Sequence, residues 1–343
     1  MRNLILRSLV IGGLLAVISN VPARDRYAFY EGKTIRMVVG FSAGGGFDVY
    51  SRALARHLPK HIPGNPTIIV ENMVGAGSLI SANHVYKVAK PDGLTIGHFI
   101  GGLFLAQLLE APGIAFDARK FEFVGSPVKD TPVCVLTKAS GITNIKNWMN
   151  ATPPVKLGAL APGNSTYDHP KLLQDILGLP IQIVLGYKGT SDIRLAAEGG
   201  EVAGGCWTWD SIKATSSKAI ESGNLIVVLQ MTPQPIPDLP NVPLAIQYTK
   251  SQEGRRLIEV AVHDISDLMR PYALPPGTPQ DRVQVLQKAF QDTLKDPAFL
   301  DEANKSKLTL DPVSGVELKN KVSSLFDLSP SLQAKLKALL AVN

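Results

Sequence analysis

The chain has 343 residues, of which 45% are hydrophobic and 19% are charged, and its formal net charge is +6. This length supports one large or two medium domains, and the composition is that of a globular protein rather than a disordered one. The basic residues form no dense run, which argues against a nucleic-acid partner.

The N-terminal segment, residues 1–23, has the features of a secretory signal peptide. Arg2 and Arg7 supply positive charge, and the apolar run over 8–17 is shorter than the about 20 residues that a membrane-spanning helix needs. Val21-Pro-Ala23 then offers small side chains to a signal peptidase. We therefore expect cleavage after about Ala23 and a periplasmic mature protein. Cleavage removes two arginines and no acidic residue, which lowers the net charge to +4.

The first strand-to-helix junction contains three consecutive glycines. Ile35–Val39 predicts a strand, and the sequence FSAGGGFD over 41–48 predicts a loop that enters an amphipathic helix. Free backbone N–H groups at the positive end of a helix form a site for an anion. A tight turn with positive φ values explains the glycines equally well. Because a carboxylate repels an anionic ligand, we interpret Asp48 as a capping group for the first helical turn; pairing with a cationic or hydroxyl group of a ligand is the alternative.

The rest of the chain alternates strands with helices. The predicted strands are 67–71, 94–96, 132–137, 155–160, 181–185 and 225–231, and the predicted helices are 78–89, 167–178, 190–199 and 279–295. This alternation predicts an α/β protein whose parallel sheets are covered on both faces. Loops of small residues recur at 72–77, 162–166 and 186–190, where open α/β sheets place ligands. We expect two α/β lobes with the ligand in the cleft between them.

Two pairs of residues in the second half allow two interpretations each. Trp207 and Trp209 alternate along a predicted strand and would face the same side, either in the core or against an organic ligand in the cleft. Cys134 and Cys206 lie in apolar surroundings without a CxxC spacing. In an oxidising compartment they can pair, but buried free thiols explain them at least as well.

No catalytic or metal-binding arrangement stands out. Gly32-Lys-Thr34 ends like a phosphate-binding P-loop, but Tyr27 stands where its first glycine is needed, and Gly75-Ala-Gly77 lacks the third glycine of a dinucleotide fingerprint. The chain contains no Gly-x-Ser-x-Gly elbow. We therefore expect a binding protein that is not an enzyme and needs no metal or cofactor. A periplasmic hydrolase or lyase acting on an organic acid, or a ligand sensor for a membrane signalling protein, is the alternative.

Six segments carry a resemblance to a known family: Ile35–Asp48, Val70–Gly77, Ala89–Thr95, Gly186–Gly189, Leu239–Pro243 and Leu274–Pro279. Together, and in this order, they resemble the extracytoplasmic solute-binding proteins of tripartite tricarboxylate transporters, the Bug family. The resemblance implies a two-lobed periplasmic-binding-protein fold of type II, the Venus flytrap arrangement. Lobe 1 is expected over 24–129 plus 249–343, and lobe 2 over 130–248. It also implies a monomer that captures a small organic acid and delivers it to membrane permease subunits.

The resemblance further implies which residues bind the ligand. Family members hold a ligand carboxylate through the first strand-to-helix loop and the facing loop of the second lobe, partly through water. With the tryptophan segment added, the expected ligand-binding residues are Phe41, Ser42, Ala43, Gly44, Gly45, Asp48, Gly163, Asn164, Ser165, Thr166, Tyr187, Gly189, Thr190, Trp207 and Asp210. The sequence departs from the family at 206–210, where the family carries smaller and more polar residues, and between Pro243 and Leu274, where this chain is longer.

Overall fold

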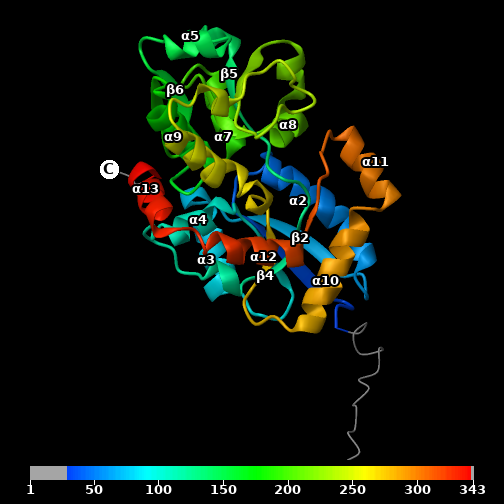
Figure 1. Ribbon diagram of the computed structural model, residues 1–343. Helices are drawn as coiled ribbons and strands as arrows, with labels where there is room; N and C mark the ends of the chain where they lie inside the picture. Colours follow the sequence, from blue (N-terminus) through cyan, green and yellow to red (C-terminus); the bar gives the residue numbers. More distant parts are fainter. Residues whose placement is uncertain (1–28, 341–343) are drawn as a thin grey trace, which may run out of the picture.

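The computed structural model describes residues 29–340, so the predicted signal peptide lies outside the described residues. Two sheets organise the chain (Figure 1). Sheet A has six strands in the order β11-β4-β10-β3-β1-β2, and sheet B has five in the order β7-β6-β8-β5-β9. The strands are β1 Thr34–Val39, β2 Thr67–Asn72, β3 Thr95–His98, β4 Glu122–Ser126, β5 Pro132–Thr137, β6 Val155–Gly158, β7 Ile181–Val184, β8 Gly204–Thr208, β9 Leu225–Gln230, β10 Tyr272–Leu274 and β11 Val313–Ser314.

Both sheets are mixed, which corrects the expectation of parallel sheets. Strand β1 runs parallel to β2 and β3, and β6 runs parallel to β7 and β8. Strand β10 is antiparallel to β3 and β4, and β5 is antiparallel to β8 and β9. Strands β5 and β10 are the first strands that the chain forms after it passes from one sheet to the other. Parallel strands need a crossover connection, but a strand that arrives from the other sheet can run in either direction.

Helices surround each sheet, as the predicted α/β class requires. The α-helices are α2 Gly46–His57, α3 Leu79–Lys87, α4 Gly102–Leu108, α5 Ile145–Met149, α6 Ser165–Leu172, α7 Thr190–Glu198, α8 Trp209–Glu221, α9 Gln252–Ile258, α10 Gln280–Thr293, α11 Pro297–Lys305, α12 Gly315–Leu325 and α13 Pro330–Leu340. In Figure 1, α5, α7, α8 and α9 lie in the upper lobe with sheet B, and α2, α3, α4, α10 and α12 lie in the lower lobe with sheet A. Among residues 29–340, no helix combines the length and the apolar character needed to cross a bilayer.

The alternation of side chains along β1 shows why helices cover both faces of sheet A. Ile35 and Met37 are buried in one apolar cluster together with Tyr50 and Leu54 of α2. Val38 points the other way, into a second cluster that continues through both lobes. Since successive residues of a strand face opposite sides, an apolar strand of this kind is stable only between two covering layers.

The chain passes between the two sheets twice. Residues 127–131 lead from β4 into β5, and residues 231–271 lead from β9 back to β10. Sheet A is therefore built from two separate parts of the chain, and sheet B from the part between them. This confirms the expected two-lobed α/β fold. The residue boundaries of the lobes stay a prediction.

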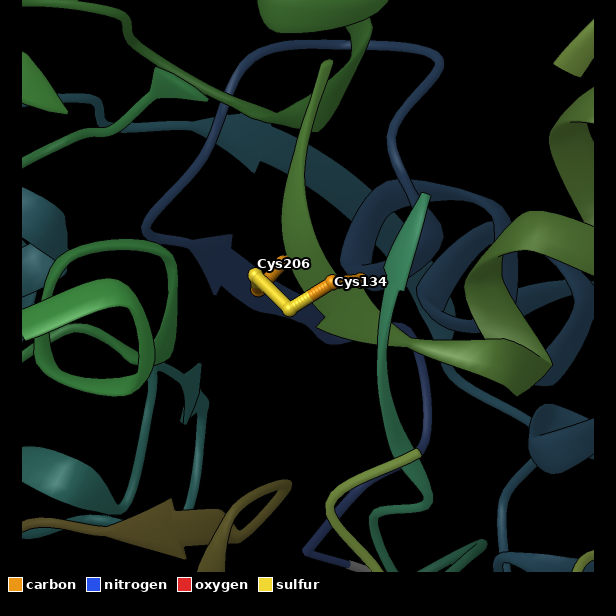
Figure 2. Close-up of a disulfide and its surroundings, with 2 residues drawn as sticks. All are labelled: Cys134 and Cys206. Atoms are coloured by element: carbon orange, nitrogen blue, oxygen red, sulfur yellow. A yellow bond between two sulfur atoms is a disulfide. The ribbon is translucent and has the colours of Figure 1, made fainter. Parts of the chain in front are cut away.

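The two cysteines are joined by a disulfide, so the alternative of buried free thiols was wrong (Figure 2). Cys134 and Cys206 stand directly opposite each other on the antiparallel neighbours β5 and β8. Directly opposite residues have Cβ atoms close enough for a disulfide, and 72 residues separate the two in sequence. Only the pairing of the strands brings them together.

The two tryptophans do not share a strand face, which corrects a second expectation. Strand β8 ends at Thr208, and Trp209 is the first residue of α8. The Trp209 backbone N–H donates to the Thr131 carbonyl at 2.8 Å, and its indole N–H donates to Asp238 at 3.0 Å. Only Trp207 remains in the strand, next to the disulfide.

Candidate functional site

Four helices begin around one cavity between the lobes. They are α2, α6, α7 and α8, each of which follows a strand of sheet A or sheet B. The cavity has a volume of about 30 Å³. Its walls are Phe41, Gly45, Gly46, Phe47, Ile100, Asp130, Leu160, Asn164, Ser165, Thr166, Thr190, Trp207, Thr208, Ser211 and Arg270. The backbone N–H groups of a first helical turn have no partner within the helix, and the helix dipole makes that end positive. Their convergence creates a site suited to an anion.

Asp48 holds the glycine loop in shape. Its side chain is only 4% exposed and accepts hydrogen bonds from the Gly44 N–H at 2.9 Å, from Arg52 Nε at 2.9 Å and from Asn72 Nδ2 at 2.9 Å. Asn72 also donates to the Phe41 carbonyl, at 2.8 Å. Burial alone would raise the pKa of Asp48, but these donors hold the pKa below its usual value. Asp48 therefore stabilises the loop before α2 rather than capping the N–H groups of the first helical turn, as was expected, and the Gly44 N–H is already engaged.

The loop before α6 is built in a similar way. Gly163 has a φ of +79°, a conformation that favours glycine, and its N–H donates to Asp168 Oδ1 at 3.0 Å. Asn164 caps the helix by accepting from the Thr166 N–H at 3.0 Å. The Thr166 hydroxyl in turn accepts from the Leu160 N–H at 3.0 Å. Asp168 has no cationic partner among the described residues, and burial raises its pKa to about 7.

The loop before α7 touches the glycine loop across the cleft. The Ser42 N–H donates to the Lys188 carbonyl at 3.2 Å, and the Ser42 and Ser191 hydroxyls are 3.0 Å apart. Ser191 Oγ also donates to the Ala43 carbonyl at 3.1 Å. A Cβ atom on Gly189 would lie 2.1 Å from Ser42 Oγ, so this contact requires glycine. These contacts hold the two lobes together.

The floor of the cavity is made by the two crossovers between the sheets. Asp130, from the first crossover, accepts from Arg270 Nε of the second at 3.0 Å, and both side chains are almost fully buried. Asp210, at the start of α8, accepts from the hydroxyls of Thr131 at 2.6 Å and Thr208 at 3.2 Å. The pair of Asp130 and Arg270 therefore fastens together the segments that join the lobes.

The cavity includes some of the predicted ligand-binding residues and excludes others. Those that line it are Phe41, Gly45, Asn164, Ser165, Thr166, Thr190 and Trp207. Those that do not are Ser42, Ala43, Gly44, Asp48, Gly163, Tyr187, Gly189 and Asp210. Most of the second group shape the loops, whereas Tyr187 donates to Glu201 on the surface. As a set, the predicted residues stay a prediction.

Sequence reasoning missed several lining residues. Gly46 and Phe47 lie inside the predicted loop over 41–48, but the ligand-binding residues expected there were only 41–45 and Asp48. Asp130 and Arg270 lie in the crossovers and belong to no motif, so no local signal marks them. Their place at the site depends on how the two lobes are joined.

A larger cavity, of about 210 Å³, lies next to the site but has few polar groups. It is lined by the end of α4 and residues 109–112 that follow it, by Pro162, Gly163 and Asp168, and by Lys337 and Leu340 of α13. We place the candidate site in the smaller cavity because four helix starts meet there. Within residues 29–340, no cluster of His, Cys, Asp and Glu could hold a metal ion.

Comparison with known proteins identifies the family and the fold. Residues 51–320 match the model of the tripartite tricarboxylate transporter family receptor, TctC. A UPF0065 protein from Cupriavidus necator is 26% identical over 307 residues, covering 87% of this chain and 86% of that protein. The structure of the periplasmic binding protein BugD covers 90% of this chain and 98% of its own, with 24% identity and a TM-score of 0.73. MatC from Rhodopseudomonas palustris, with bound malate, covers 90% and 99%, with 20% identity and a TM-score of 0.70.

The fold is thus that of periplasmic binding proteins, and the matched family model spans most of the chain. Receptors of this family bind solutes and are not enzymes. The alternative of a hydrolase or lyase is therefore wrong. The chain belongs to the tripartite tricarboxylate transporter receptor family.

Proposed function

We propose that this protein captures a carboxylate-bearing small organic molecule in the cleft between its lobes and delivers it to the membrane subunits of a tripartite tricarboxylate-type transporter. It does so in the periplasm, after removal of residues 1–23. The observation that carries the proposal is the meeting of four helix starts at one cavity. The malate in MatC, a relative with the same fold, is an acid of this class.

The hydrogen bonds of the two aspartates define which donors hold the carboxylate. The N–H groups of Gly44 and Gly163 are engaged by Asp48 and Asp168. The Thr166 N–H is engaged by Asn164, so the remaining candidates are the N–H groups in the first turns of α2 and α7, the Ser165 N–H, and the hydroxyl groups of Ser165 and Thr190, which line the cavity. Such neutral donors can surround a carboxylate without a cationic side chain.

Ligand binding must be accompanied by movement of the lobes. A volume of about 30 Å³ holds about one water molecule and no organic acid. The contacts of Ser42 with Lys188 and Ser191 join the lobes, so we expect them to break when the lobes open. Opening and closing about two crossovers is the usual motion of two-lobed binding proteins, and a membrane partner can recognise the closed form.

A thermal-shift screen followed by calorimetric titration tests the assignment. The panel contains mono-, di- and tricarboxylates, malate among them, and aromatic acids. At least one acid is expected to raise the melting temperature, because a ligand that binds only the folded state stabilises it by mass action. A complete absence of shifts would remove the carboxylate assignment.

Gly45→Val tests the position of the site. A Cβ atom at Gly45 would lie 3.2 Å from Thr190 Oγ1, so the larger side chain pushes α2 and α7 apart. We expect about tenfold or weaker binding with an unchanged circular dichroism spectrum. Gly199→Ala, at the exposed end of α7 with Cβ contacts of 3.4 Å or more, is the matched control. Equal affinity in both variants would move the site elsewhere.

Crosslinking of the ligand-loaded protein to native membranes tests the partner. Capture of a transporter permease subunit is the expected result. Capture of a signalling receptor in its place would support the sensor alternative.

A further inference from the structure

Arg270 reaches the cavity with one nitrogen unpaired. Its side chain is 1% exposed and lines the cavity. Nε donates to Asp130 at 3.0 Å, and Nη2 donates to Ser211 Oγ at 2.6 Å. Nη1 is buried and has no hydrogen-bond partner among residues 29–340. Buried polar groups are almost always paired, so a donor of this kind at a binding cavity calls for an acceptor.

The ring of Phe47 contacts both the Arg270 guanidinium group and a second side chain with unpaired nitrogens. Arg270 Cζ lies 4.7 Å from the centre of the Phe47 ring. The ring centre of His98 lies 4.5 Å from the Phe47 ring and 3.9 Å from that of Tyr272. His98 is fully buried, and neither of its ring nitrogens has a partner among the described residues. Phe47 itself is only partly buried and lines the cavity, so its side chain can move when the lobes open.

The charges around Arg270 indicate which kind of group is missing. Asp130 already pairs with the guanidinium, and Asp210 lies close enough to interact with it electrostatically. The other polar neighbours are the hydroxyl groups of Tyr50 and Tyr272, and burial lowers the pKa of His98, which keeps its ring neutral. The cluster therefore already contains two acidic side chains beside its single guanidinium group. It lacks a hydrogen-bond acceptor, not an anion.

We propose that Arg270 Nη1 donates a hydrogen bond to a second oxygen-bearing group at the far end of the ligand, with the Phe47 ring displaced. The ligand class is then a short organic acid whose second end carries an amide, oxo or carboxyl oxygen. A methyl group or an ammonium group at that end is disfavoured, because neither accepts a hydrogen bond. This inference rests on the proposed function, since the first carboxylate is held by the helix starts.

A purely structural role for Arg270 predicts something different. As the clamp between the crossovers, it would affect stability and all ligands alike. As a specificity-determining residue, it changes the ratio of affinities between ligands that differ only at the second end. The experiment therefore measures that ratio.

Titration calorimetry on the full mature chain uses straight-chain acids of four to six carbons in matched sets. At each length the second end is an amide, a carboxylate, a methyl group or an ammonium group; succinamate, succinate, butyrate and 4-aminobutyrate form the shortest set. We expect the amide- and carboxylate-ended acids to bind about 10- to 100-fold more tightly than the methyl-ended acid, as one charge-assisted hydrogen bond allows. Equal binding, or tightest binding of the ammonium-ended acid, overturns the inference.

Two variants assign the preference to Arg270. Arg270→Lys keeps a positive charge beside Asp130 but removes Nη1, and the double variant Asp130→Asn with Arg270→Met removes both buried charges in case the single variant folds poorly. Each is expected to lose most of the preference for the oxygen-ended acids, with a much smaller loss for the methyl-ended acids. Phe47→Ala retains the preference, because it opens the space in front of Nη1.

The outcomes separate the two proposals. Binding of methyl-ended acids without any preference refutes the role of Arg270 and leaves the carboxylate site standing. A preference that survives both Arg270 variants also refutes that role. If no acid of these sets binds, this inference fails; the proposed function fails as well only when the wider panel of the thermal-shift screen also gives no binding.

Discussion

The loops before α2 and α6 share one local design but differ in how they treat a buried carboxylate. In each, a glycine with a positive φ donates its N–H to an aspartate in the first part of the helix, Gly44 to Asp48 and Gly163 to Asp168. Asp48 receives further hydrogen bonds from Arg52 and Asn72, and its pKa is lowered. Asp168 receives no hydrogen bond from another side chain among the described residues, and burial raises its pKa to about 7.

The comparison shows that the number of donors, rather than burial alone, decides the charge state of an aspartate in such a loop. A carboxylate with several donors stays ionised in a buried position, whereas one with a single backbone donor takes up a proton near neutral pH. The two loops face the same cleft. Because Asp48 accepts more hydrogen bonds than Asp168, we expect the loop before α2 to be held more firmly than the loop before α6. Three substitutions test it.

Asp168→Asn is expected to have the largest effect, and it stabilises the protein. A folded-state pKa raised from 3.8 to about 7 means that ionisation of Asp168 opposes folding as the pH rises through this range. Each pKa unit corresponds to about 1.4 kcal/mol, so the gain in unfolding free energy at pH 8 is at most about 4 kcal/mol. Urea unfolding at several pH values measures it, and the gain should vanish near pH 4.

Asp175→Asn is the matched control on the same helical segment. Asp175 forms an i,i+4 ion pair with Lys171 and is partly exposed. Its loss should change the unfolding free energy by about 0.5 kcal/mol or less. A stability gain in this variant, or a pH-independent gain in Asp168→Asn, would contradict the assigned role of Asp168.

Asp48→Asn is expected to destabilise the protein by about 1.5–3 kcal/mol at pH 7, since it removes a charged acceptor of three hydrogen bonds. The lowered folded-state pKa makes this contribution complete above the unfolded pKa of about 3.9 and lost as the pH falls through the lower folded value. The difference from the wild type should therefore shrink only below about pH 4. A deficit that already narrows between pH 7 and pH 5 would be inconsistent with this role.

Asp192→Ala tests a third loop in which an aspartate accepts from a backbone N–H, and it should change the unfolding free energy the least. Asp192 accepts from the Lys188 N–H at 3.1 Å in the loop before α7, in an exposed position. Because water can replace this acceptor, we expect a loss of about 1 kcal/mol or less by urea unfolding. A loss of unfolding free energy as large as that of Asp48→Asn would show that burial does not determine how much these hydrogen bonds stabilise the protein.

Much of the candidate site could be predicted from sequence because it is built from local patterns. An apolar run followed by small residues and an amphipathic segment predicts a strand, a loop and a helix in that order, and the loops before α2, α6 and α7 lie where these patterns indicate. The sequence failed at 206–210, where alternating tryptophans suggested a continuing strand. There the hydrogen bonds of Trp209 with Thr131 and Asp238 favour the start of a helix, and these partners are distant in sequence.

By itself, the sequence determined the α/β class, the absence of a catalytic motif, and the loops that face the cleft, since each depends on interactions between residues close together in the chain. Only the tertiary structure decided that Cys134 pairs with Cys206, that β5 and β10 run antiparallel to their neighbours, and that Asp130 and Arg270 meet beneath the cavity. In each case the partners are separated by many residues. Their contact depends on strand register and on the path of the two crossovers, which no local pattern of residues specifies.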